Sequence, residues 1–469
     1  MALKYESKNV WKNLKENELD LVMDYANRYM AFLDNSKTER RCANEIIKLA
    51  KNNGFEDYNE VLKTGKIEPG TKIYLNNKEK SVALVVIGKQ SLEAGMNIVG
   101  SHIDAPRLDL KPFPLYEDGN MALLKTHYYG GVKKYQWTCI PLSLHGIVFT
   151  KDGNKIDISI GENQDEPVFY INDLLIHLSA DQMQKKLSEG ITGEQLNVVV
   201  GHRPMISIDS EEKEIKDPVK ENILHILNEK YGIIEEDFML AEFEIVPADK
   251  ARHVGLDSSM ISAHGHDDRV CAYAGLEAIF DVEIPEITAV SLFVDKEEIG
   301  SVGNTSMESK FFENMIAELI ALQGEYSDLK VRRAFTNSKV LSADVTVGFD
   351  PTFPEVLDKK NAAMIGHGVT ISKYTGARGK GGCNDANAEY LAYVRKVFEQ
   401  NEVIWQIGEL GKVDQGGGGT IAYILAQYGA EVVDCGVPML SMHAPLELVS
   451  KADIYMTYRA YSSFLKYAQ

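Results

Sequence analysis

Five short segments rich in carboxylates or histidine constrain the fold of this chain more than any other feature. Each lies at or just after the end of a predicted strand: GSHIDAPRLDL with His102 and Asp104, HGHDDRV with Asp267 and Asp268, VDKEEIGS with Glu297 and Glu298, LSADVTVG with Asp344, and LSMHAPLE with His443. Open α/β sheets place their ligands at the carboxyl ends of their strands. Brought together there, these side chains would suffice for two divalent cations, with one carboxylate left over as a base for hydrolysis.

Composition narrows the class of protein and its partners. A chain of 469 residues fits two packed domains, and a net charge of −19 argues against nucleic acid or an anionic membrane as the main partner. The five cysteines contain no Cys-x-x-Cys pair, so neither a thiolate zinc site nor a disulfide framework is indicated. No run has the length of a membrane-spanning helix, and the first residues lack the apolar region of a signal peptide. We therefore expect a cytoplasmic protein with reduced cysteines.

The order of predicted elements indicates a discontinuous main domain. The run Val82–Ile87 is almost continuously apolar, as in a strand that is covered on both faces. From residue 107 to 246 the segments become shorter and more strand-like, and none of the five polar segments lies there. We predict an α/β fold in which residues 1–106 and 247–469 form a mixed sheet with helices on both faces. Residues 107–246 form a β-rich inserted domain.

Two pairs of neighbouring residues suit a metal site. His102 and Asp104 are two apart and share one face of a strand, so Asp104 could hold the ring N–H of a metal-bound imidazole. Asp267 and Asp268 begin a predicted helix, where a carboxylate can cap the helix or bridge two cations. We assign the bridging role to Asp267, with Asp268 as the alternative.

The other segments add a base and further ligands. Glu297 and Glu298 follow an apolar strand, where adjacent side chains point apart, so one can bind metal while the other faces water. Asp344 is predicted inside an apolar strand, where an ionised carboxylate is costly unless it is paired or metal-bound. His443 ends an apolar run. The competing interpretation is a solvated acidic turn for the glutamates and a buried, hydrogen-bonded residue for Asp344 and His443.

The ordered set of motifs resembles the M18 family of metalloaminopeptidases, the aspartyl aminopeptidase and aminopeptidase I group, and is closest to its bacterial aminopeptidase 1 type. The matching text is GSHIDAPRL, YGGVKKYQW, LLIHL, the Asp267 segment, VDKEEIGS, SADVTVGFDP and SMHAPLE. The resemblance implies hydrolysis of the N-terminal peptide bond of peptides by a water that two metal ions activate. It implies zinc, with manganese or cobalt as alternatives.

The same resemblance implies a role for each site residue. His102, Asp267 and Asp344 would hold one ion, and Asp267, Glu298 and His443 would hold the other. Asp104 would orient His102, and Glu297 would be the general base.

The insertion would be the family's dimerisation domain in a dodecamer built from dimers, with active sites that face an internal chamber. His177 of the LLIHL segment would reach a neighbour's site, and Lys373 would meet an acidic substrate side chain. The text around Asp267 and the loop from Arg378 to Cys383 depart from the aspartyl aminopeptidase pattern, so the preferred N-terminal residue stays open.

Two other functions are compatible with parts of the pattern. An amidase, deacylase or carboxypeptidase could use the same dinuclear chemistry, because metal ligands alone do not define the substrate. A non-catalytic, self-assembling shell protein could also share the fold. Such a protein is expected to lose Glu297 or several ligands, and all of them are present in this chain.

Overall fold

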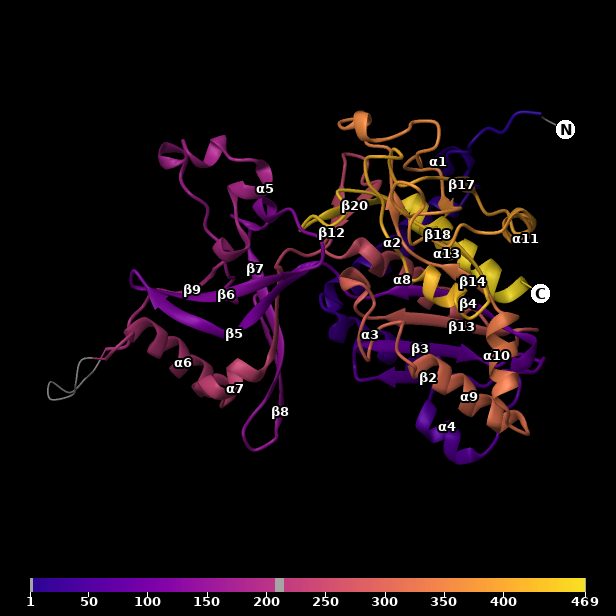
Figure 1. Cartoon of the computed structure of the whole chain (residues 1–469), viewed down its shortest axis with the longest axis horizontal. Coiled ribbons are helices and arrows are strands. Elements are labelled where there is room, and N and C mark those ends of the chain that lie inside the picture. The colour runs from indigo at the N-terminus through magenta and orange to yellow at the C-terminus, as the bar shows by residue number, and fades with distance from the viewer. Residues whose placement is uncertain (1–2, 207–214, 469) are drawn as a thin grey trace. The chain divides into compact units, whose positions relative to one another are not determined.

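The computed structural model describes residues 3–206 and 215–468, which divide into two compact units (Figure 1). Unit 1 contains the residues up to Ala105, the stretch Ala251–Met442 and the residues from Glu447 onward. Unit 2 contains Pro106–Lys250 and the short stretch His443–Leu446. No helix within the described ranges is long and apolar enough to cross a bilayer.

A nine-stranded mixed sheet forms the centre of unit 1. In spatial order its strands are β1 (Glu56–Asp57), β2 (Lys72–Asn77), β3 (Ser81–Val86), β13 (Thr288–Val294), β4 (Met96–His102), β14 (Lys339–Ser342), β18 (Glu431–Gly436), β16 (Val369–Ser372) and β17 (Trp405–Ile407). Strand β4 runs parallel to both of its neighbours, β13 and β14. The carboxyl ends of these three central strands therefore lie at one edge of the sheet.

Helices cover both faces of this sheet, as the apolar strands predict. They are α1 (Val10–Asn13), α2 (Glu18–Asn35), α3 (Glu39–Asn52), α4 (Tyr58–Thr64), α8 (His266–Phe280), α9 (Phe311–Gln323), α10 (Asp328–Thr336), α11 (Ala388–Gln400), α12 (Ala422–Ala426) and α13 (Lys451–Tyr467). In β3, Val82 and Leu84 belong to the core with α2, α3, α8 and α13, whereas Ala83 and Val85 belong to the core with α9 and α10. Both faces of β3 are thus buried, and the predicted fold class is confirmed.

A second, five-stranded sheet in unit 1 explains why one local prediction is wrong. Its order is β11 (Arg252–Val254), β12 (Met260–Ala263), β20 (Glu447–Ser450), β19 (Pro438–Leu440) and β15 (Thr346–Val347). Asp344 was predicted inside one continuous strand, but it lies between β14 and β15. The chain leaves the large sheet after the Ala343 N–H donates to the Gly100 carbonyl at 2.7 Å, and joins the small sheet where the Thr346 N–H donates to Val437 at 3.0 Å. Asp344 therefore lies at the crossing between two sheets.

Unit 2 is built on a six-stranded antiparallel sheet. Its order is β8 (Lys155–Ile160), β7 (Leu142–Phe149), β10 (Glu242–Pro247), β5 (Arg107–Asp118), β6 (Met121–Tyr129) and β9 (Val198–Gly201), and its helices are α5 (Leu187–Gly190), α6 (Pro218–Tyr231) and α7 (Glu235–Leu240). Helix α6 begins at Pro218 and ends before Gly232, whose left-handed conformation (φ +70°) stops the helix. A separate apolar core lies between the sheet and the helices α6 and α7.

A buried carboxylate in α13 makes the stability of unit 1 depend on pH. Burial raises the pKa of Asp453 to about 7, although Asp453 accepts the N–H groups of Gly366 at 2.6 Å and Gly368 at 2.7 Å. An unfolded aspartate has a pKa of about 3.9, so between these two values the folded state binds more protons than the unfolded state. The stabilising contribution of Asp453 to the free energy of unfolding is thus present below about pH 4 and is lost as the pH rises towards about 7.

We expect Asp453→Asn to flatten the dependence of the free energy of unfolding on pH across this window. Urea denaturation at a series of pH values measures the effect, with Asp20→Asn on the exposed surface of α2 as the control. An Asp453→Asn slope equal to that of the wild type would contradict this assignment.

Candidate metal centre

Five of the predicted ligand and base residues gather at the carboxyl edge of the central strands, together with the alternative residue Asp268. His102, Asp268 and Asp344 offer ligand atoms that all lie within 4.8 Å of one another. A second group within the same limit contains His102, Asp267 and Glu298. The two groups share His102, and the Glu297 Oε2 atom lies 3.9 Å from His102 Nε2. Residues from four distant segments of unit 1 therefore meet in one place.

His102 is held so that one ring nitrogen faces the carboxylates. It is the last residue of β4 and is 2% exposed. Its Nδ1 lies 3.1 Å from the Asp104 carbonyl oxygen and 3.3 Å from Asp104 Oδ1, so Nδ1–H is the donor on that side. Its Nε2 lies 3.2 Å from Asp267 Oδ1. This is the arrangement that a metal-binding imidazole needs, with its second nitrogen held by an acceptor.

Asp267 and Asp268 lie in the first turn of α8, and both are buried. The turn begins at Gly265 in the left-handed region (φ +74°), where a Cβ would lie 2.0 Å from Nη1 of Arg269. Asp267 and Asp268 keep non-helical backbone angles, so their side chains are not in the register of the helix that follows. The Asp267 N–H donates to Oε2 of Glu447 at 3.0 Å. The sharp entry into α8 thereby places both carboxylates beside His102.

Glu297 and Glu298 lie on a 3₁₀ turn, Glu297–Ile299, after β13, where an extended or bulged strand end was predicted. The cause is Lys296, whose left-handed conformation (φ +68°) turns the chain immediately after β13. The N–H groups of Glu297 and Glu298 donate to Oδ1 and Oδ2 of Asp104, each at 3.2 Å. Asp104 thus contacts His102 through its carbonyl oxygen and Oδ1, and its carboxylate also binds the glutamate turn.

The electrostatics of the cluster suit a cation. Burial, with the neighbouring carboxylates, raises the pKa values of Asp268 and Asp344 well above their ordinary range. Burial lowers the pKa of His102, but hydrogen bonds to Asp104 and Asp267 outweigh this effect and raise it well above its usual value. Asp268 is buried, and contacts of its carboxylate with the Cys271 thiol and the His102 backbone only partly offset the rise in its pKa, without a strictly aligned hydrogen bond among the described residues. A buried carboxylate among other carboxylates fits a bound divalent cation.

Three other predicted residues are not members of these two groups. His443 belongs to unit 2, where its Nδ1 lies 2.9 Å from the Gly131 carbonyl oxygen. His177 lies in an exposed 3₁₀ turn of unit 2, Ile176–Leu178, and Lys373 is exposed directly after β16. The roles predicted for these three residues stay predictions.

Two contacts that support Asp267 were not predicted from the sequence. Glu447 is 1% exposed and binds the Asp267 N–H. Tyr29 of α2 is within 2.7 Å of Nδ1 of His266, the residue before Asp267, and His266 Nε2 donates to the Ile261 carbonyl at 3.2 Å. The signal for Glu447 was its place in the LSMHAPLE segment, whereas nothing in the sequence connects Tyr29 with His266.

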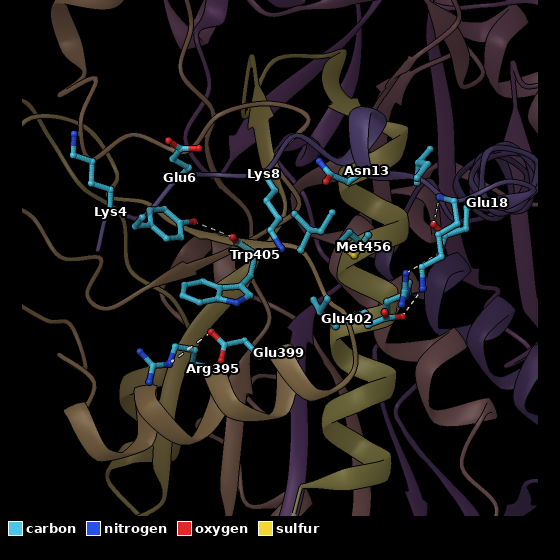
Figure 2. A pocket seen from close by; sticks show the side chains of 16 residues that line it. Lys4, Glu6, Lys8, Asn13, Glu18, Arg395, Glu399, Glu402, Trp405 and Met456 are labelled. Atoms are coloured by element: carbon cyan, nitrogen blue, oxygen red, sulfur yellow. Dashed lines mark hydrogen bonds and ion pairs between the residues drawn. The ribbon is translucent and has the colours of Figure 1, made fainter. Parts of the chain in front are cut away.

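A cavity elsewhere in unit 1 has a different lining. A cavity of about 640 Å³ lies between the N-terminal segment, α11 and α13 (Figure 2). Figure 2 shows Lys8 and Trp405 among its lining residues, and Tyr5 donates a hydrogen bond to the Trp405 carbonyl oxygen at 3.2 Å. None of the residues in the two groups above lines this cavity.

Comparison with known proteins identifies the family of this chain. The aminopeptidase I zinc metalloprotease family, M18, matches residues 32–465. A probable M18 family aminopeptidase 1 from Clostridium acetobutylicum is 50% identical over 461 residues, which is 98% of each chain. The crystal structure of an M18 family aminopeptidase from Thermotoga maritima has a TM-score of 0.93 and 44% identity, covering 99% of this chain and 100% of the other. The crystal structure of aminopeptidase I from Clostridium acetobutylicum has a TM-score of 0.91 and 47% identity over the same shares.

These likenesses define a metallopeptidase, an enzyme that hydrolyses peptide bonds. The chain belongs to the M18 family of aminopeptidase I zinc metalloproteases, and the resemblance expected from its motifs is confirmed.

Proposed function

We propose that this aminopeptidase cleaves the first peptide bond of peptides with two bound divalent cations and with Glu297 as general base. The observation that carries the proposal is the position of the Glu297 carboxylate. It lies 3.9 Å from His102 Nε2, beside both groups of candidate ligands, yet belongs to neither. A base for hydrolysis needs this combination, because a carboxylate that is tied to metal cannot also accept the proton of the attacking water.

The candidate ligands divide between two cations. We propose that His102, Asp267 and Asp344 hold one ion and that Asp267 and Glu298 hold the other. Asp268 is the alternative to Asp267 as the shared ligand. His443 keeps its predicted role as a ligand. Imidazole and carboxylate donors suit zinc, and manganese or cobalt are the alternatives. Bound cations would supply Lewis acidity and lower the pKa of water toward neutrality.

The side chains of the protein then perform the proton transfers. Glu297 accepts the proton of the attacking water and returns it to the nitrogen of the leaving amine. Asp104 holds the Glu297 N–H and the His102 ring, so it keeps the base and a ligand in fixed relation. Carboxylates near the site attract a free α-ammonium group, which limits attack to the first peptide bond. We propose that Lys373 contacts the substrate of its own chain and that His177 contacts the substrate of a neighbouring chain.

A panel of substrates tests the reaction class. We expect turnover of aminoacyl anilides and of peptides with a free N-terminus. The corresponding N-acylated substrates, and substrates that report cleavage of the C-terminal residue, should be inert. Preferential hydrolysis of the N-acylated or C-terminal substrates would favour the amidase, deacylase or carboxypeptidase instead. Rates across different N-terminal residues, for the wild type and for Lys373→Met, then define the preferred residue.

We further propose that the chain assembles through unit 2, as dimers within a dodecamer. Six large apolar side chains between residues 174 and 187 are exposed by 46–72%: Leu174, Leu175, Ile176, Leu178, Met183 and Leu187. So many exposed apolar side chains in one short segment indicate a surface that another copy covers.

The oligomer is tested by light scattering on the full chain. We expect the mass of twelve chains of 52.3 kDa each. A double variant, Ile176→Asp with Leu178→Asp, should dissociate the assembly, because it places charge in an apolar contact. Leu240→Asp, at an 81% exposed position of the same unit, is the control and should leave the mass unchanged. A monomeric wild type, or a double variant of full mass, would refute this mode of assembly.

A further inference from the structure

The segment from Asp295 to Thr305 carries both glutamates of the site, and its two ends are tied together. The Asp295 N–H donates to the Thr305 carbonyl oxygen at 3.3 Å, and Thr305 Oγ1 donates to Asp295 Oδ2 at 2.6 Å. Asp295 is 1% and Thr305 2% exposed. Water therefore does not compete for these contacts, and the segment forms a closed loop with Glu297 and Glu298 near its beginning.

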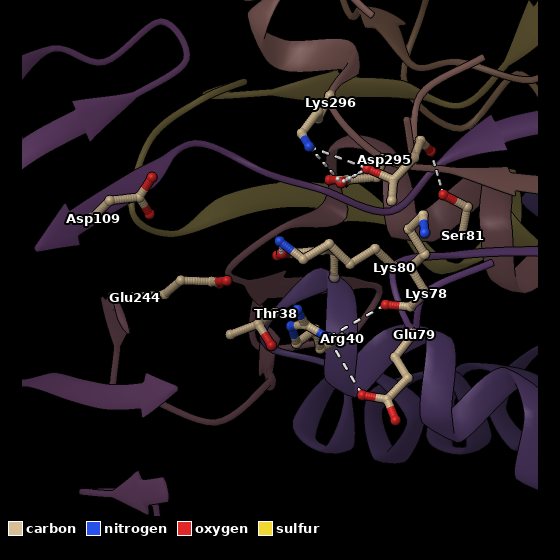
Figure 3. Close-up of polar contacts among 12 residues, drawn as sticks. Thr38, Arg40, Lys78, Glu79, Lys80, Ser81, Asp109, Glu244, Asp295 and Lys296 are labelled. Atoms are coloured by element: carbon tan, nitrogen blue, oxygen red, sulfur yellow. Dashed lines mark hydrogen bonds and ion pairs between the residues drawn. The ribbon is translucent and has the colours of Figure 1, made fainter. Parts of the chain in front are cut away.

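Lys296 links this closure to the glutamate turn. Its Nζ donates to Thr305 Oγ1 at 3.2 Å and lies 3.8 Å from Asp295 Oδ2 (Figure 3 shows Lys296 beside Asp295). A threonine hydroxyl has one hydrogen and two acceptor positions, so Thr305 donates to Asp295 while it accepts from Lys296. Lys296 is also the residue whose left-handed backbone starts the turn before Glu297. The hydroxyl of Thr305 is thus connected to the backbone that carries the base.

The base of the loop is attached to the central sheet. The Ser81 hydroxyl, at the start of β3, donates to the Thr305 carbonyl oxygen, and Asn77 Nδ2, at the end of β2, donates to the Asn304 carbonyl at 3.1 Å. From the other side, Asp104 accepts the N–H groups of Glu297 and Glu298. The glutamate turn is therefore held on one side by Asp104, just after β4, and on the other by the contact of Asp295 with Thr305. That contact is itself bound to the hairpin of β2 and β3.

We infer that Thr305 is a positioning residue, whose hydroxyl fixes Glu297 for proton transfer through Asp295 and Lys296. Thr305 acts through the turn and not on the substrate. The inference rests on the proposed function of Glu297. It differs from a packing role, because packing requires the shape of the side chain, whereas positioning requires its hydroxyl group.

Thr305→Val keeps the shape of the side chain and removes the hydroxyl group. We expect kcat to fall roughly 10- to 100-fold, because small displacements of a catalytic group have effects of this size. KM should change less than about threefold, because substrate binding is retained. Thr305→Ser, which keeps the hydroxyl, should recover most of the lost kcat. Thr457→Val, at another buried threonine whose hydroxyl donates to the Asp453 carbonyl, is the matched control.

Two results would overturn the inference in an enzyme whose wild type is active. One is a Thr305→Val kcat within about threefold of the wild type, and the other is a Thr305→Ser enzyme as slow as Thr305→Val. If Thr305→Val does not fold, Lys296→Met replaces it, because that side chain is 26% exposed, and the same loss of kcat without a change in KM is expected. A wild type without turnover of free N-termini contradicts the proposed function itself, so the two failures are distinguishable.

Discussion

Replacing Glu297 with glutamine is expected to lower kcat by about 10²- to 10⁴-fold, the range that a general base contributes. Glutamine has nearly the same shape but cannot accept the proton of the attacking water. The metal content should stay at the wild-type value, because Glu297 belongs to neither group of candidate ligands. Steady-state kinetics on an aminoacyl anilide and elemental analysis of the same preparation measure both quantities.

The control for this substitution is Glu325→Gln, an equal change of charge at an exposed position. It should retain wild-type kcat. A Glu297→Gln enzyme with near wild-type turnover would show that another group accepts the proton. Loss of metal from the Glu297→Gln enzyme would instead indicate that Glu297 is a metal ligand.

Removing the carboxylate of Asp267 is expected to empty both cation sites and abolish turnover. Asp267 is the proposed bridge, so Asp267→Ala should reduce the metal content to below about one ion per chain even after zinc, manganese or cobalt is supplied. Glu298→Ala and Asp344→Ala each remove a ligand of one site only. Each of these should therefore retain about one ion per chain.

Two comparisons make this prediction specific. Asp268→Ala tests the alternative bridge, and a complete loss of metal in Asp268→Ala, with metal retained in Asp267→Ala, would exchange the two roles. Asp328→Ala removes an acidic residue from the first turn of α10 and controls for an effect on helix stability alone. Full metal content in all of these variants would show that the ions bind elsewhere.

Much of the site could be predicted from the sequence, because it depends on strand ends. The apolar runs that became β4 and β13 were visible, and parallel strands bring their carboxyl ends to one edge. The Glu297 carboxylate, which follows β13, therefore lies 3.9 Å from Nε2 of His102 at the end of β4. The ordered motifs also identified the family, which the comparisons confirm.

The remainder depends on interactions that leave no local pattern. Asp344 lies outside a strand because the chain changes sheets there, which long-range pairing decides. The glutamate turn follows from the left-handed backbone of Lys296. A lysine rarely adopts this conformation, so the sequence does not predict it. The closure of Asp295 on Thr305 and the contact of Glu447 with Asp267 likewise join segments whose proximity only the folded chain creates.

The central claim is that residues at the carboxyl edge of the sheet hold a pair of cations beside Glu297. Anomalous diffraction at the zinc absorption edge, from crystals of the zinc-loaded enzyme, tests it most directly. We expect two peaks roughly 3.5–4 Å apart, within bonding distance of His102, Asp267, Glu298 and Asp344, with Glu297 beside them. Peaks elsewhere in the protein, or none at this edge in a catalytically active preparation, would contradict it.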